Sequence, residues 1–346
     1  MSYNIVNLQR KEINNMYNMT LQEEKEYVEK IIQEILQGRR LTEEDDLDFL
    51  EYGCLEYLTE GADRIRRELC GNGVNLCSII NGRSGKCSEN CKFCAQSAHH
   101  HTGIETYDLL DEETVLKDCH HHARKGVHRY SIVTAGKTLE GEELQKACAI
   151  YRRMHEETGM QLCASHGLLS DEAFAMLKEA GVENYHANIE TSRRYFPNVC
   201  TTHTFDDKIS CIKRAKAAGL KVCSGGIIGM GETFRDRMDM ALTLAQLEIE
   251  SIPINALIPV KGTCFGELET LSEEEILRSI AMFRFINPTA YIRLAAGRTL
   301  MEDSGKKAFL AGANATITGD MLTTSGNDIE GDKKMLTEMG FSLDMV

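Results

Sequence analysis

The sequence contains no uninterrupted apolar stretch of about 18 residues, the length that a membrane-spanning helix needs. Its N-terminal segment also lacks the apolar run and small-residue cleavage site of a secretory signal peptide. Basic residues are in the minority, because 39 Lys and Arg stand against 53 Asp and Glu, for a net charge of −14. Nucleic acid and anionic membrane surfaces require clustered positive charge, so neither is expected as a partner. We expect a cytoplasmic protein.

No second pair of closely spaced cysteines is present that could complete a four-thiol zinc site, and no Pro- or Ser-rich linker divides the chain. The 346 residues are 42% hydrophobic, which suits one domain of barrel size. The sequence has 13 cysteines, and disulfides are not expected in a reducing compartment. This number of thiols favours metal or cluster chemistry, or life without oxygen.

Three of these thiols lie within eight residues, at Cys87, Cys91 and Cys94, in C-x3-C-x2-C spacing. Thiolates are soft ligands, and three on one short loop can bind three corners of an iron–sulfur cube. The fourth iron then has no protein ligand and is free to bind another molecule. A zinc loop or a chance cluster is the alternative, but zinc sites usually supply two pairs of ligands.

Beyond residue 70, short apolar strands alternate with longer amphipathic helices. The strand candidates are residues 74–80, 128–135, 160–165, 183–190, 220–229, 251–258, 289–296 and 313–318. Capping boxes open helices at Thr204, Thr233 and Ser272. Strands that alternate with helices predict parallel pairing through right-handed crossovers, and eight of them predict a closed (β/α)8 barrel. The cysteine loop would then lie at the C-terminal mouth of this barrel.

Before the barrel, a capping box at Thr20 and Glu23 predicts a helix that Gly38 ends. A second box at Thr42 and Asp45 predicts another helix. We therefore expect an N-terminal helical extension over residues 1–69 and the barrel, with a C-terminal segment, over residues 70–346.

Four strand candidates carry an unexpected residue near their middle, namely Ser131, Cys163, Cys223 and Arg293. Inward side chains of a barrel stack in layers, so these four would form one layer of thiols and arginine. A buried arginine is costly without an anionic partner, which cluster sulfur could supply. The alternative is two small core residues and an ion pair at one barrel end. Three further thiols could reach the same cavity: Cys77, Cys200 and Cys264.

The motif C-x3-C-x2-C with Phe93 before its last cysteine resembles that of the radical S-adenosylmethionine (SAM) superfamily. Further runs resemble biotin synthases over roughly residues 70–340. They are CSENCKFCAQS, YHANIETS, KVCSGGIIGMGET, SIPINALIPVKGT, YIRLAAGR and AGANATITGDMLTT. The resemblance implies a homodimeric barrel that inserts sulfur into dethiobiotin to give biotin. It also implies SAM, a 4Fe–4S cluster that cleaves SAM, and an auxiliary iron–sulfur cluster as sulfur donor.

The same resemblance assigns the three loop cysteines to the SAM cluster. Asn188 and Glu190 would bind the SAM ribose, and Gly225 and Gly226 would let the backbone approach SAM closely. Asn188 and Asn255 would face the ureido ring of dethiobiotin.

The auxiliary cluster would be bound by Cys163, Cys223 and Arg293. Two positions depart from the usual family pattern: Ser131 replaces a cluster cysteine, and His186 replaces a substrate-binding asparagine. The first departure resembles the variant biotin synthases of anaerobes, which contain a four-iron, sulfide-rich auxiliary cluster in place of a 2Fe–2S cluster. Cys200 is the expected additional ligand. A flavodoxin or ferredoxin would donate electrons, and a sulfur or cluster-assembly donor would rebuild the cluster.

Related radical SAM barrels, such as hydrogenase maturases and methylornithine synthase, are the nearest alternatives. A non-catalytic iron–sulfur electron carrier or a zinc-stabilised binding protein is the alternative from another class. Two histidine tracts remain outside these assignments. We expect His120, His121 and His122 to be solvated surface residues, and the tract at residues 99–101 receives no role.

Overall fold

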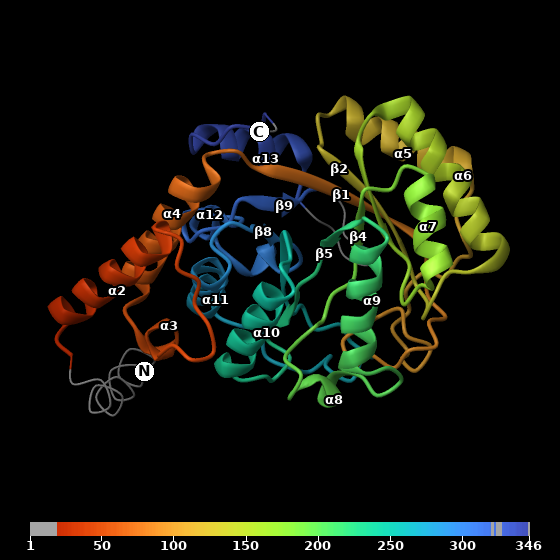
Figure 1. Ribbon diagram of the computed structural model, residues 1–346. Helices are drawn as coiled ribbons and strands as arrows, with labels where there is room; N and C mark the ends of the chain where they lie inside the picture. The colour runs from red at the N-terminus through yellow and green to blue at the C-terminus, as the bar shows by residue number, and fades with distance from the viewer. Residues whose placement is uncertain (1–18, 320–321, 323–326, 345–346) are drawn as a thin grey trace.

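The computed structural model describes residues 19–319, 322 and 327–344. Its centre is a closed barrel of parallel strands surrounded by helices (Figure 1). The strands are β1 (Asn75–Arg83), β2 (Arg129–Thr134), β3 (Gln161–Ser165), β4 (Asn184–His186), β5 (Lys221–Cys223), β6 (Gly226–Ile228), β7 (Ser251–Ala256), β8 (Tyr291–Leu294) and β9 (Ala315–Ile317). The end of the AGANATITGDMLTT run lies partly outside the described residues.

The barrel closes because β5 and β6 both pair with β7, while β1 pairs with β2 and β9. Strands β5 and β6 together are the predicted fifth strand, interrupted at Ser224 and Gly225. At this break the chain passes very close to β7, since a Cβ on Gly225 would lie 1.9 Å from the carbonyl oxygen of Pro253. The predicted barrel of eight parallel strands is confirmed.

The helices cover the outside of the barrel. They are α2 (Leu21–Leu36), α3 (Asp48–Tyr52), α4 (Leu55–Cys70), α5 (Glu112–Arg124), α6 (Gly141–Thr158), α7 (Asp171–Glu179), α8 (Phe196–Val199), α9 (Phe205–Ala217), α10 (Phe234–Gln246), α11 (Glu273–Ile286), α12 (Lys306–Leu310) and α13 (Ile329–Glu338). The capping boxes at Thr204, Thr233 and Ser272 are all present. Among the described helices, none combines the length and apolar character that crossing a bilayer requires.

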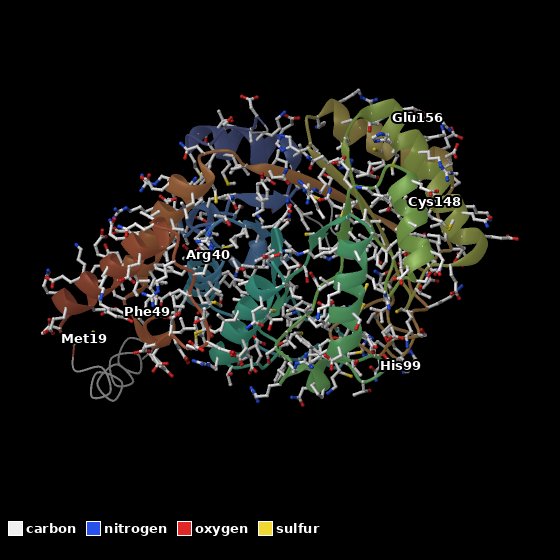
Figure 2. The ribbon with its side chains drawn as sticks, in the orientation of Figure 1. Met19, Arg40, Phe49, His99, Cys148 and Glu156 are labelled. Atoms are coloured by element: carbon white, nitrogen blue, oxygen red, sulfur yellow. The ribbon has the colours of Figure 1, made fainter. Side chains whose placement is uncertain are left out.

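The N-terminal helices pack against one side of the barrel (Figure 1). Phe49, labelled in Figure 2, lies between Tyr27 and Phe285, at ring-centroid distances of 5.6 and 5.8 Å. Helix α2 begins after its predicted capping box at Thr20. The prediction that a second capping box, at Thr42 and Asp45, begins a helix was wrong. Asp45 accepts a hydrogen bond from the Thr42 amide at 2.8 Å within a turn, and α3 begins only at Asp48. The division between residues 69 and 70 stays a prediction.

Candidate active site

A cavity of about 340 Å³ lies inside the barrel, toward the C-terminal ends of the strands. Most of the predicted site residues line it, although they come from the cysteine loop and five different parts of the barrel. These are Phe93, Cys94, Cys163, His186, Asn188, Glu190, Cys223, Asn255 and Arg293. The residues predicted for the site that do not line this cavity are Cys87, Cys91, Cys200, Gly225 and Gly226.

The loop that carries the three cysteines follows β1 directly and folds back on itself. The Cys87 amide donates to the Gln96 carbonyl at 3.0 Å, and the Cys87 carbonyl accepts from Ala98 at 2.8 Å. The Cys94 amide donates to the Cys91 carbonyl at 3.0 Å. Burial raises the pKa of the Cys94 thiol to about 11, so this group favours its neutral form unless a cation binds it. Three thiols held on one folded loop fit the donor set of an iron–sulfur cluster.

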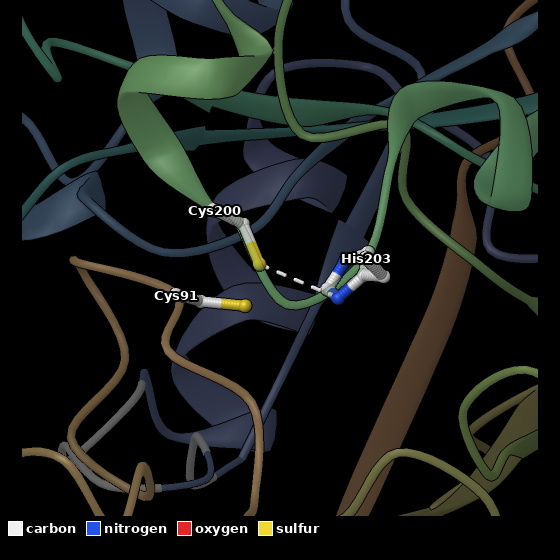
Figure 3. Close-up of side chains that lie close together, drawn as sticks. All are labelled: Cys91, Cys200 and His203. Carbon is white, nitrogen blue, oxygen red and sulfur yellow. Dashed lines mark hydrogen bonds between the residues drawn. The ribbon is translucent and has the colours of Figure 1, made fainter.

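Cys200 lies beside Cys91 at the mouth of the barrel (Figure 3). The ligand atoms of Cys91, Cys200 and His203 all lie within 4.8 Å of one another, and Cys200 Sγ is 3.3 Å from His203 Nδ1. The same His203 nitrogen contacts the carboxylate of Glu89. The hydrogen bond from the Cys91 thiol is the main cause that lowers the pKa of Cys200, to about 3. The structure therefore places Cys200 with the cysteine loop and not in the deeper layer of thiols.

The deeper layer is present as the alternation of strand residues predicted. Ser131 lies opposite Cys163 in the register of β2 and β3, and His186 lies opposite Cys223 in that of β4 and β5. Cys163 and Cys223 are buried and line the cavity together with Arg293. A third thiol joins them, because Cys77 on β1 is buried and lines the same cavity. We call Cys77, Cys163, Cys223 and Arg293 the thiol layer.

The pKa values of Cys163 and Cys223 in this layer are shifted in opposite directions. Burial raises the pKa of Cys163 to about 12. Burial also raises the pKa of Cys223, but a hydrogen bond with His186 and the charges of Arg293 and Arg129 outweigh it and lower this pKa to about 6. Within the thiol layer, Cys223 is thus the thiol that most readily becomes a thiolate, the form that binds metal.

Arg293 is 2% exposed and is fixed by four hydrogen bonds. Its Nη2 donates to Asn75 Oδ1 at 2.6 Å, and its Nη1 donates to the carbonyls of Asn75 and Thr316 at 3.2 and 3.1 Å. Its Nε lies 3.4 Å from Ser251 Oγ. These partners are neutral, and burial accordingly lowers the pKa of Arg293. The guanidinium keeps a net charge that an anion in the cavity would balance.

Sequence reasoning missed Arg129, which also lines the cavity and is 7% exposed. It lies opposite Cys77 in the register of β1 and β2. The signal was available, since Arg129 precedes Ser131 by two residues and strand positions two apart share a face.

Two of the residues predicted to bind SAM, Asn188 and Glu190, line the cavity, whereas Gly225 and Gly226 lie behind them. Asn188 Oδ1 accepts from the Gly225 amide at 3.0 Å, and Glu190 lies 3.7 Å from Lys208 Nζ. Glu190 has a positive φ of 68°, which turns the chain at the end of this segment. Close packing requires glycine at positions 225 and 226. A Cβ on Gly226 would lie 2.3 Å from the Glu190 carbonyl oxygen, and a Cβ on Gly225 would clash with Pro253 of β7.

Asn255, predicted to face the substrate, uses its amide to connect strands. Its Nδ2 donates to the Gly226 carbonyl at 3.1 Å and its Oδ1 accepts from the Ala296 amide at 3.2 Å.

The second histidine tract, residues 120–122, was predicted to be solvated, and this prediction was wrong for His122. Its side chain is buried, and its Nδ1 lies 2.9 Å from the Asp118 carbonyl oxygen. Of the first tract, His100 Nδ1 lies 2.8 Å from the Cys94 carbonyl oxygen and so supports the cysteine loop. His99 is exposed (Figure 2).

Comparisons with known proteins match the chain to two protein-family models and to relatives of high sequence identity. Residues 83–244 match the radical SAM superfamily, and residues 253–342 match the biotin and thiamin synthesis associated domain. A biotin synthase of Alkaliphilus metalliredigens is 68% identical over 316 residues, which are 91% of this chain and 99% of that relative. This chain belongs to the biotin synthase family. A biotin synthase of Clostridium perfringens strain 13 is 50% identical, covering 92% of this chain and 99% of its own length.

Membership of the biotin synthase family makes the chain a radical SAM enzyme. SAM and a 4Fe–4S cluster are its implied cofactors, and dethiobiotin is its substrate. The alternative of a non-catalytic electron carrier or a zinc-stabilised binding protein was therefore wrong.

Solved structures share the fold at low sequence identity. Methylornithine synthase has a TM-score of 0.79 at 20% identity, covering 91% of this chain and 97% of its own. The FeFe-hydrogenase maturase of Carboxydothermus hydrogenoformans has a TM-score of 0.74 at 17% identity, covering 99% of this chain and 84% of its own. These likenesses show the barrel alone, and the biotin synthase relatives decide between the related radical SAM barrels.

Proposed function

We propose that dethiobiotin is converted to biotin in the barrel cavity, between the cysteine loop and the thiol layer. The observation that supports this site is that Cys94 of the cysteine loop and all members of the thiol layer line one cavity of about 340 Å³. A radical formed at the mouth would meet a substrate held above a sulfur source. A cofactor radical is needed because side chains cannot cleave an unactivated C–H bond.

At the mouth, Cys87, Cys91 and Cys94 would bind the 4Fe–4S cluster, which supplies the electron that cleaves SAM. Asn188 and Glu190 would hold the SAM ribose, with Glu190 accepting hydrogen bonds from its hydroxyls. Phe93 lines the cavity beside Cys94 and would cover the cofactor. Gly225 and Gly226 would contribute by keeping β6 close to Glu190 and β7.

The thiol layer would bind the auxiliary cluster through Cys163, Cys223 and Arg293. Ser131 offers only a hydroxyl where the usual family pattern has a thiol, and Cys77 on the neighbouring strand supplies a thiol to the same cavity. We therefore favour Cys77 over Cys200 as the further ligand. Ser131 in place of the usual cysteine, together with the resemblance to the variant biotin synthases of anaerobes, supports the larger, sulfide-rich form of the cluster.

Dethiobiotin would lie between these two groups. The side chains of Asn188, Asn255 and His186 line this part of the cavity and offer the amide and imidazole groups that a cyclic urea can pair with. The mostly apolar remainder of the wall suits the aliphatic chain of the substrate.

Three partners complete the proposal. A flavodoxin or ferredoxin would reduce the cluster, a sulfur or cluster-assembly donor would restore the auxiliary site, and a second copy of the chain would form a homodimer. The family resemblance supports each of them.

The test is an anaerobic reaction of cluster-loaded protein with a strong reductant, SAM and dethiobiotin, analysed by mass spectrometry. Biotin together with 5′-deoxyadenosine is the expected result. Cys223→Ala should still cleave SAM but form no biotin. The matched control is Cys148→Ala, which removes a buried thiol from α6 outside the cavity (Figure 2) and should retain both products. If iron-loaded wild-type protein formed neither biotin nor 5′-deoxyadenosine, that result would contradict the proposal.

A further inference from the structure

A second cavity, of about 190 Å³, opens at the N-terminal end of the barrel strands, opposite the candidate active site. We call it the lower cavity. Its outer part is formed by exposed residues, including Lys221 and Glu250. Its inner part is formed by buried residues at the starts of the strands, including Asn75, Arg129 and Ser251. The proposed function uses none of this space.

Only a thin layer of side chains separates the lower cavity from the thiol layer. Arg129 lines both cavities. Ser251, which lines the lower cavity, accepts a hydrogen bond from Cys223 Sγ at 3.4 Å and lies 3.4 Å from Arg293 Nε. A small ligand in the lower cavity would therefore be one side chain away from Cys223.

Arg129, which lines this cavity, has one buried hydrogen-bond donor without a partner among the described residues. Its Nη2 donates to Gln161 Oε1 at 3.3 Å, but its Nε is buried without an acceptor among the residues that the structure describes. An unpaired buried N–H costs about 1–3 kcal/mol, so an acceptor at this position would be stabilised. Lys221 at the rim is a second cation; its Nζ lies 3.7 Å from Glu250 in an exposed pair that is weak.

We propose that the lower cavity admits and binds a small sulfur anion, hydrosulfide, which restores sulfur to the thiol layer. This inference rests on the proposed function. The upper cavity would be filled by SAM and dethiobiotin, whereas the lower one reaches the same thiols from the other end. Hydrosulfide releases one proton and contributes sulfide in place of the sulfur that leaves in the product. The replacement itself therefore needs no oxidant and no reductant.

The experiment follows isotopically labelled sulfide. Cluster-loaded protein is incubated anaerobically with ³⁴S-sulfide in the absence of SAM, freed of excess sulfide, and its acid-labile sulfide is analysed by mass spectrometry. A second sample then receives SAM and dethiobiotin, and the label in biotin is measured. Lys221→Trp would narrow the entrance, and Lys221→Glu would reverse its charge. Lys213→Glu on α9 is an exposed control outside the cavity.

Before any incubation with ³⁴S-sulfide, both Lys221 variants should form biotin as the wild type does. After that incubation, the label in their acid-labile sulfide and in their biotin should be at least tenfold below that of the wild type. The control should take up label normally. Uptake at the wild-type rate in both Lys221 variants would overturn the lower cavity as the entrance. Failure of the proposed function is distinguishable, because the wild type would then exchange labelled sulfide but form no biotin.

Discussion

Replacement of Arg293 by methionine tests whether this buried cation serves the sulfur source or only the fold. The change removes four hydrogen bonds, of which one is to the Asn75 side chain and two are to backbone carbonyl groups. At about 0.5–1.5 kcal/mol for each bond, the cost in unfolding free energy is roughly 2–6 kcal/mol. If Arg293 also balances an anion in the thiol layer, Arg293→Met should form little biotin while 5′-deoxyadenosine formation persists.

Arg284 provides a matched control, because it is a fully buried arginine away from the cavity. It donates to the carbonyls of Gly312, Pro288 and Ala290 at 2.9, 3.0 and 2.8 Å and to Asn314 Oδ1 at 2.8 Å. Arg284→Met should lower the urea midpoint of the cluster-free protein at least as much as Arg293→Met. Only Arg293→Met should change the ratio of biotin to 5′-deoxyadenosine. An equal ratio in both variants would refute a role for Arg293 in sulfur insertion.

Three further predictions concern the cofactor loop and stability. Cys94→Ala should reduce SAM cleavage to background, whereas Cys264→Ser, at an exposed thiol, should not. Arg298→Met should cost about 3–5 kcal/mol in urea unfolding, because it leaves the buried Asp332 carboxylate without its bidentate partner at 2.7 and 2.9 Å. Burial lowers the pKa of His166 to about 3 from 6.5 unfolded, so stability should be full above about pH 6.5 and fall by roughly 4–5 kcal/mol toward pH 3.

Each of these has an outcome that contradicts it. SAM cleavage by Cys94→Ala at the wild-type rate would remove that thiol from the cluster. Unchanged urea unfolding of Arg298→Met would mean that Asp332 is solvated or protonated in the folded protein. For His166, the comparison is His166→Gln, which should flatten the fall in stability between pH 6.5 and 3; an equally steep fall would assign the acid sensitivity to other groups.

Much of the fold could be predicted because its signals are local. The capping boxes at Thr204, Thr233 and Ser272 each depend on residues three apart, and the structure contains all of them. The box at Thr42 failed because a residue outside the pattern competes for its carboxylate: Arg39 also binds Asp45, which stabilises a turn between α2 and α3. A capping pattern predicts a helix only when nothing outside it competes for the same side chain.

The site was predictable to the extent that strand alternation determines it. Alternation placed Cys163, Cys223 and Arg293 in one layer, and the structure brings them to one cavity. The place of Cys200 could not be predicted, because it depends on a loop contact. Asn90 Oδ1 accepts from the amides of residues 201 and 202 at 2.9 and 3.2 Å, and this contact ties Cys200 to the cysteine loop.

The charges of the barrel interior give an argument that does not depend on family resemblance. Arg129 and Arg293 are both buried, and within the described chain they donate hydrogen bonds to side-chain amides, backbone carbonyls and one hydroxyl. Two guanidinium groups in one closed barrel are very costly unless anions balance them. The groups that can become anionic beside them are the thiols of Cys77, Cys163 and Cys223, and the two arginines favour their thiolate forms. The two arginines and the three thiols are therefore best explained together, as a site for an anionic metal group bound by thiolates. Side chains that serve only to pack the core would not combine buried guanidinium groups with thiols in this way.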